Sequence, residues 1–257
     1  MKLKRKTVGR YLLGTFLLSY IAWGIIILAN CFGKLQYGTP LSMVLYLIGG
    51  FSPTIVACIV LIRDKEVEGL KQICRDSFRF RQKPMVYVMI LLLSVIPFII
   101  PWIVGNFVVN GPVYYIVAML PMMIFGGGLE EVGWRYILQP ALEKKLPFLA
   151  ATVIVGIIWV CWHIPLFLIS GTTQNLYMSL PVFAVELLGI SFVMAFIRKI
   201  GSGIWPCILF HALHNALGAT YGILENIKIS LITTVFLVVL SVVCNKVFGL
   251  AYSKKNG

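Results

Sequence analysis

The stretch Gly126-Gly127-Gly128-Leu129-Glu130-Glu131-Val132-Gly133-Trp134-Arg135 places two adjacent carboxylates and an arginine in a very apolar chain. Of the 257 residues, 60% are hydrophobic and only 12% are charged. A soluble domain carries about 25% charged residues, so most of this chain must lie in membrane spans of about 20 residues each. Ionisable groups within a span cost roughly 2.5–3.5 kcal/mol each and mark candidate functional sites.

The apolar segments around this stretch predict an all-α, polytopic membrane helix bundle that forms a single domain over residues 1–257. We expect about eight transmembrane helices, near residues 11–31, 41–62, 85–108, 113–143, 148–170, 180–197, 204–221 and 229–248. The fourth would be about 45 Å long at 1.5 Å per residue, too long for one straight span. A break or kink is therefore expected at the glycine triplet. The long polar segment 63–84 predicts a surface helix or a solvated loop.

The basic residues predict the orientation of the bundle. If the N-terminus is cytoplasmic and the chain crosses eight times, all but three of the 22 Lys and Arg residues lie on the inner side. The three others are Lys34, Lys228 and the intramembrane Arg135. The positive-inside rule then predicts a cell-membrane protein with both termini in the cytoplasm. Although the net charge is +13, the basic residues punctuate apolar runs, which argues against nucleic-acid binding.

The histidines place further polar groups at a similar depth in the membrane. His163 ends Trp159-Val-Cys-Trp-His163 in one expected span, and His211-Ala-Leu-His214-Asn215 lies in another. From the inner face, we expect depths of about 14–20 Å for Glu130, about 12 Å for His211 and about 23 Å for His163. These depths lie broadly within the middle of a ~30 Å hydrocarbon core, so the three segments predict one functional site.

Helical spacing separates the groups on the glutamate segment. Glu131 and Arg135 are four residues apart, on one helix face, where an ion pair forms readily. Glu130 points about 100° away and is therefore the candidate catalytic carboxylate.

The same spacing orders the histidine segments. His211 and Asn215 present two side chains to one point, and His214 either shares their face or is structural. Trp159 shares a face with His163 and is expected to wall the site.

These residue types predict activation of water. A desolvated glutamate can act as a general base near neutral pH, and a histidine can share that proton or donate it to a leaving amine. Asn215 and His211 could donate hydrogen bonds to an oxyanion. Glu130, His163 and His211 could instead ligate zinc, although the zinc motif His-Glu-x-x-His is absent. The weak ligand Asn215 tilts the interpretation towards the oxyanion role.

Two other classes of function remain open at this point. Intramembrane carboxylates, including Glu186, also suit a proton-coupled transporter, although no inverted repeat is visible. A non-catalytic immunity or scaffold protein would retain the same residues. The six cysteines are scattered without a Cys-x-x-Cys pair, so they support neither a disulfide framework nor a zinc ribbon.

Three motifs resemble those of the type II CAAX prenyl proteases and bacteriocin-processing enzymes, the membrane endopeptidases called the CPBP or Abi family. Glu-Glu-x-x-x-Arg is matched by Glu130, Glu131 and Arg135. Phe-x-x-x-His reads Trp159-x-x-x-His163, with a different aromatic residue, and His-x-x-x-Asn is matched by His211 and Asn215. The motifs occur in the family's order and cover residues 126–218.

This resemblance implies an eight-helix endopeptidase whose site opens towards the cytosol and hydrolyses a membrane-associated substrate close to the membrane surface. It implies that Glu130 and His163 activate water, while His211 and Asn215 stabilise the oxyanion. Members are described both as metalloproteases and as metal-independent glutamate proteases, so zinc stays an alternative. Eukaryotic members cleave prenylated proteins. This small, basic chain is similar to bacterial members, for which bacteriocin maturation or self-immunity is the usual role.

Overall fold

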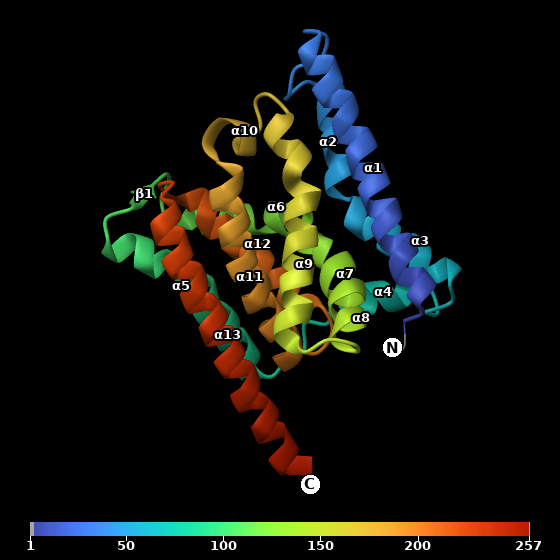
Figure 1. Cartoon of the computed structure of the whole chain (residues 1–257), viewed down its shortest axis with the longest axis vertical. Helices are drawn as coiled ribbons and strands as arrows, with labels where there is room; N and C mark the ends of the chain where they lie inside the picture. The colour runs from blue at the N-terminus through green and yellow to red at the C-terminus, as the bar shows by residue number, and fades with distance from the viewer. Residues whose placement is uncertain (1–2, 257) are drawn as a thin grey trace.

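The computed structural model describes residues 3–256, with side chains up to residue 248, and shows a helical bundle (Figure 1). Among the basic residues used for the orientation, Lys2 and the side chains of Lys254 and Lys255 lie outside the described residues. The all-α class predicted from the sequence is confirmed, and one short two-stranded ribbon is added to it.

The first half of the chain forms one flank of the bundle and a surface segment. Helix α1 is followed by a pair, α2 and α3, that bends by 50° at the break between them. The polar segment then contains the short helix α4, and the prolines of α5 lie within that helix. The bounds are α1 Arg5–Cys31, α2 Pro40–Gly50, α3 Ser52–Arg63, α4 Leu70–Ser77, α5 Pro84–Ile103 and β1 Phe107–Val109.

The glutamate segment is broken where its glycines predicted a break. Helix α6 ends at Gly126, and the chain continues as a 3-10 turn, a single α-helical turn, a π-helical turn and a last short α-helix. A π-helical turn within an α-helical segment often occurs at a functional site. The bounds are α6 Tyr114–Gly126, η1 Gly128–Glu130, α7 Glu131–Gly133, η2 Trp134–Leu138 and α8 Gln139–Glu143.

The second half of the chain supplies the centre of the bundle and its other flank. Helix α11 packs against both α9 and α13, and α12 packs against α5 and α6. In Figure 1, α1 to α3 lie on one flank and α5 with α13 on the other, with α9, α11 and α12 between them. The bounds are α9 Phe148–His163, η3 Ile164–Leu168, α10 Thr173–Tyr177, α11 Leu180–Ile200, α12 Trp205–Thr220, β2 Tyr221–Ile223 and α13 Ile227–Asn256.

Several of these helices can cross a membrane, so the protein is a multi-pass membrane protein. Within residues 3–256, six helices are long and apolar enough, and the bent pair α2–α3 makes a seventh. The seventh of the eight expected spans, near residues 204–221, is α12, whose 16 residues reach only about 24 Å. The expected span 85–108 also ends early, at Ile103, because Gly105 adopts a positive φ of 70° and the chain then enters β1.

The ribbon closes one end of the bundle. Strands β1 and β2 are antiparallel, with Phe107 opposite Ile223 and Val109 opposite Tyr221. It lies at the upper left of the view in Figure 1, whereas α1 begins and α13 ends in the lower half. The two ends of the chain therefore lie on the same side of the bundle, opposite the ribbon.

Candidate active site

The break after α6 lies directly against α12. A methyl group built on Gly127 would be 2.5 Å from Nδ2 of Asn215 and 3.0 Å from Nε2 of His211, whereas one on Gly126 would meet nothing within 4 Å. Only a glycine therefore lets the chain pass this close to both side chains. The backbone is also held from the other side, because Thr54 Oγ1 donates a hydrogen bond of 2.6 Å to the carbonyl of Leu129.

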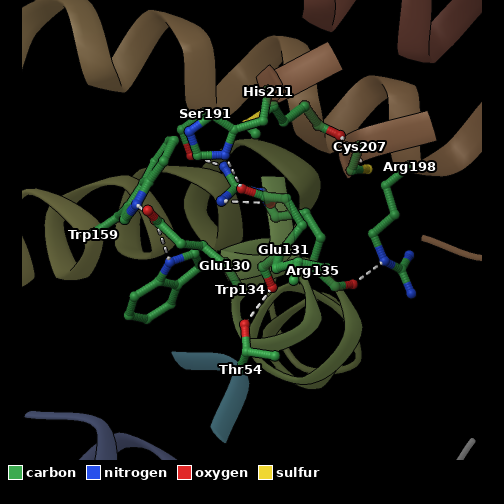
Figure 2. A network of polar contacts seen from close by, with 12 residues as sticks. Thr54, Glu130, Glu131, Trp134, Arg135, Trp159, Ser191, Arg198, Cys207 and His211 are labelled. Atoms are coloured by element: carbon green, nitrogen blue, oxygen red, sulfur yellow. Dashed lines mark hydrogen bonds and ion pairs between the residues drawn. The ribbon is translucent and has the colours of Figure 1, made fainter. Parts of the chain in front are cut away.

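Glu130 lies in the turn after this break and is held by two indole groups. Its Oε2 accepts hydrogen bonds from Nε1 of Trp159 at 3.0 Å and from Nε1 of Trp134 at 3.3 Å (Figure 2). The residue is 8% exposed. Hydrogen bonds to an ionised acceptor are stronger than neutral ones, so the two tryptophans offset part of the cost of burying this carboxylate.

Glu131 is fully buried and serves two partners. Its Oε2 lies 3.4 Å from Nη1 of Arg135, which confirms the expected ion pair, although the geometry is not that of a hydrogen bond. Its Oε1 lies 2.8 Å from Nδ1 of His211 (Figure 2). The sequence assigned Glu131 to helix structure alone, but this second contact also orients a candidate catalytic histidine. Because Nδ1 of His211 is engaged, Nε2 is the nitrogen that faces Gly127.

Arg135 is fixed by several other elements as well. Its Nη2 donates to Oγ of Ser191 on α11 at 3.0 Å, and its guanidinium carbon lies 4.8 Å from the ring centre of Trp159. Its carbonyl accepts a hydrogen bond of 2.5 Å from Nε of Arg198. A buried cation needs such partners to repay its lost hydration, so this cluster locks the glutamate segment to α9 and α11.

His163 is the last residue of α9 and lies among aromatic rings. Its Nδ1 is 2.8 Å from the carbonyl oxygen of Trp159, and its ring packs edge-on against Trp162 and Phe183, with centroids 4.6 and 5.0 Å away. Trp159 also packs edge-on against His211 at 5.3 Å. The tryptophan expected to wall the site therefore contacts Glu130, His163 and His211, and it joins three segments that are distant in sequence.

His214 is not brought to the other candidates. Its ring packs against Phe98 and Phe210, with centroids 5.4 and 6.0 Å away, and its Nδ1 is buried without a hydrogen-bond partner. Of the two interpretations given by the sequence, this position fits the structural one.

The zinc alternative finds no matching geometry. In the part of the chain that the structure describes, no three His, Cys, Asp or Glu side chains are gathered as a metal site requires. The Trp159 carbonyl and Glu131 engage only Nδ1 of His163 and His211, so Nε2 of each ring remains available. It is the placement of the described side chains that does not gather Glu130, His163 and His211 into a ligand set.

Four contributors to this site were missed by sequence reasoning: Thr54, Trp134, Ser191 and Arg198. Trp134 follows Glu130 by four residues, so helical spacing could have found it. The other three come from elements whose packing against the glutamate segment has no local sequence signal.

Comparisons with known proteins point to one family. Residues 112–217 match the sequence profile described as type II CAAX prenyl endopeptidase Rce1-like. The chain is also 24% identical to the "CAAX prenyl protease 2" of Methanococcus maripaludis, over 91% of this chain and 92% of that protein. The matched region contains every residue of the three motifs.

Proposed function

We propose that Glu130 and His163 activate water in this chain, an intramembrane endopeptidase whose residues 112–217 match the Rce1-like type II CAAX prenyl endopeptidase profile within a multi-pass bundle. Glu130 accepts a proton from the water, and the oxygen attacks the carbonyl carbon of the scissile peptide bond. The tetrahedral intermediate then collapses, the C–N bond breaks, and the proton passes through Glu130 or His163 to the leaving amine. The products are a carboxylate and an amine.

The oxyanion role of His211 and Asn215 is supported by one observation. Nε2 of His211 and Nδ2 of Asn215 converge beside Gly127, which directly precedes the turn that carries Leu129 and Glu130. A carbonyl oxygen placed there would meet two nitrogen donors when His211 carries a proton on Nε2, and such donors are most effective where charge develops. Glu131 supports this arrangement through its contact with the other nitrogen of His211.

The proposed substrate is a membrane-associated peptide or protein, either prenylated at its C-terminus or of the bacteriocin type. The similarity to the "CAAX prenyl protease 2" of Methanococcus maripaludis supports the first class, and the small basic chain supports the second. A prenylated peptide and its unprenylated twin, each offered as a quenched fluorogenic probe to the purified protein in nanodiscs, would separate these classes.

Replacement of Glu130 tests the proposed mechanism directly. We expect Glu130→Gln to lower kcat by about 10²–10⁴-fold, because the amide keeps the hydrogen bonds to the indoles but cannot take a proton. Glu68→Gln, at a carboxyl in the polar segment before α4, is the matched control and should cleave at the parent rate. Undiminished cleavage by Glu130→Gln would exclude Glu130 as the base.

The orientation in the membrane is also part of the proposal. The distribution of basic residues favours cytoplasmic termini, and this places the ribbon end of the bundle outside a cell membrane. The native Cys31 and Cys74 are both exposed and lie at opposite ends of the bundle, at the end of α1 and in α4. A membrane-impermeant maleimide applied to intact cells should label Cys31 and spare Cys74 in peptide mass spectra. The reverse pattern would turn the protein over and place the ribbon end of the bundle in the cytoplasm.

The transporter alternative gains no support. Glu186, the additional acid that it invoked, accepts a hydrogen bond of 2.7 Å from Oγ of Ser230 and so joins α11 to α13.

A further inference from the structure

A cavity of about 510 Å³ lies at the ribbon end of the bundle, between β1, β2, α10 and the first turns of α11. Its lining includes Asn110, Tyr177, Phe183, Glu186, Gly218 and Glu225. This volume is within the range of sites that bind small molecules or short peptide segments, about 300–1,000 Å³.

The cavity borders the candidate active site. Phe183 lines it and also packs edge-on against His163 at 5.0 Å, so one side chain separates the cavity from that histidine. Gly218, on the opposite wall, follows Asn215 by three residues on α12. A peptide that reached His163 from this end of the bundle would therefore pass through the cavity.

The charge of the lining is opposite to that of the chain. The protein has 22 basic and nine acidic residues, yet two of those nine acids line this cavity and none of its lining residues is Lys or Arg. One oxygen of each carboxyl is engaged, since Glu186 accepts from Ser230 and Glu225 accepts from the backbone N–H of Ser179. The second oxygen of each is left for a ligand.

We propose that this cavity is a substrate subsite for a peptide segment that carries a lysine or arginine beside the scissile bond. Glu186 and Glu225 would bind the cationic side chain, and Phe183 would pack against the segment as it approaches His163. The inference rests on the proposed function, because it takes the occupant of the cavity to be part of the peptide that is cleaved.

A binding experiment tests this subsite without turnover. The full chain carrying Glu130→Gln is placed in nanodiscs and titrated with a dansylated apolar peptide containing one lysine, and with its norleucine twin. We expect the lysine peptide to bind about tenfold or more tightly, and Glu186→Gln with Glu225→Gln to remove that difference by weakening only the lysine peptide. Glu68→Gln removes one carboxyl outside the cavity and should preserve the preference.

The outcomes separate this inference from the proposed function. The subsite would be overturned if the two peptides bound equally or if neither bound. It would also be overturned if the double variant kept its melting temperature and still preferred the lysine peptide. If the chain with Glu130 intact binds with the expected preference but cleaves neither peptide, the proposed function fails and the cationic site stands. If the two peptides are cleaved at equal rates and with equal KM, the subsite is overturned and the proposed function stands.

Discussion

Two segments of equal length differ sharply in regularity. Tyr114–Glu143 and Ile227–Asn256 each have 30 residues. The second is one continuous α-helix, whereas the first is divided into five pieces with 3-10, α and π geometry. The first holds Glu130, Glu131 and Arg135, all buried, while the described side chains of the second bury only hydroxyl groups among their polar ones.

The difference shows what burial of charge requires of a membrane helix. A hydroxyl group can be satisfied within its own helix or by one neighbour, as Thr234 is by the carbonyl of Val185. The carboxylates and the guanidinium need partners from α9, α11 and α12 at once. Breaks in the helix re-aim these side chains, and the backbone carbonyls of Leu129 and Arg135 are bonded by side chains from elsewhere.

The largest expected effect is a loss of stability when the buried ion pair between Glu131 and Arg135 is broken. Arg135→Met should lower the free energy of unfolding by about 3–5 kcal/mol, because it leaves Glu131 buried without its cation. Denaturation in mixed micelles would measure this change. Arg10→Met, which removes a cation with 44% of its side chain exposed, should leave stability nearly unchanged. Equal losses in the two variants would contradict the contrast between a fully buried cation and one that is 44% exposed.

The next largest effect is expected on catalysis, at the helix break beside Gly127. Gly127→Ala should lower kcat roughly 10²-fold, because the methyl group must displace Asn215 and His211 from their positions. Gly126→Ala, one residue earlier and facing open space, is the control and should retain activity. If both variants are equally active, the close approach at Gly127 has no part in catalysis.

The smallest effect concerns an acid outside the spans. The hydrogen bond from Thr7, with the nearby Arg10, holds the pKa of the Asp64 carboxyl below its usual range. A lowered pKa in the folded state gives stability that is present above the unfolded value of about 4 and is lost as the pH falls through the folded value. The melting temperature should therefore fall less between pH 6 and pH 3 in Asp64→Asn than in the parent. An identical fall in both proteins would exclude this contribution.

The fold could be predicted from composition and length because membrane spans are set by a single physical requirement, the thickness of the hydrocarbon core. Span positions followed from the apolar runs, and the break at residues 126–128 followed from excess length together with the glycines. The ribbon could not be predicted, since β1 and β2 are three-residue strands that pair across more than 100 residues of chain. The expected span 204–221 is only one residue longer than α12 at each end, and this margin separates 18 residues from 16.

The site was predictable only as far as helical spacing reaches. Spacing gave the pair Glu131–Arg135, and shared depth brought His163 and His211 towards Glu130. The contact of Glu131 with His211 spans 80 residues and depends on how α12 packs against the break. Ser191 and Arg198 likewise reach Arg135 because α11 packs against the glutamate segment. The sequence around each of these two residues does not indicate that contact.

The long separations within the buried charge cluster also constrain biosynthesis. Glu131 leaves the ribosome 80 residues before His211, and Arg135 leaves it 56 residues before Ser191. At about 5–20 residues per second, the first glutamates wait on the order of 4–16 s for their last partner. During that interval a carboxylate and a guanidinium are paired mainly with each other. The insertion machinery must therefore shelter residues 126–135 until α12 has been made, and variants that weaken Glu131 or Arg135 should accumulate in the membrane to lower levels than the parent.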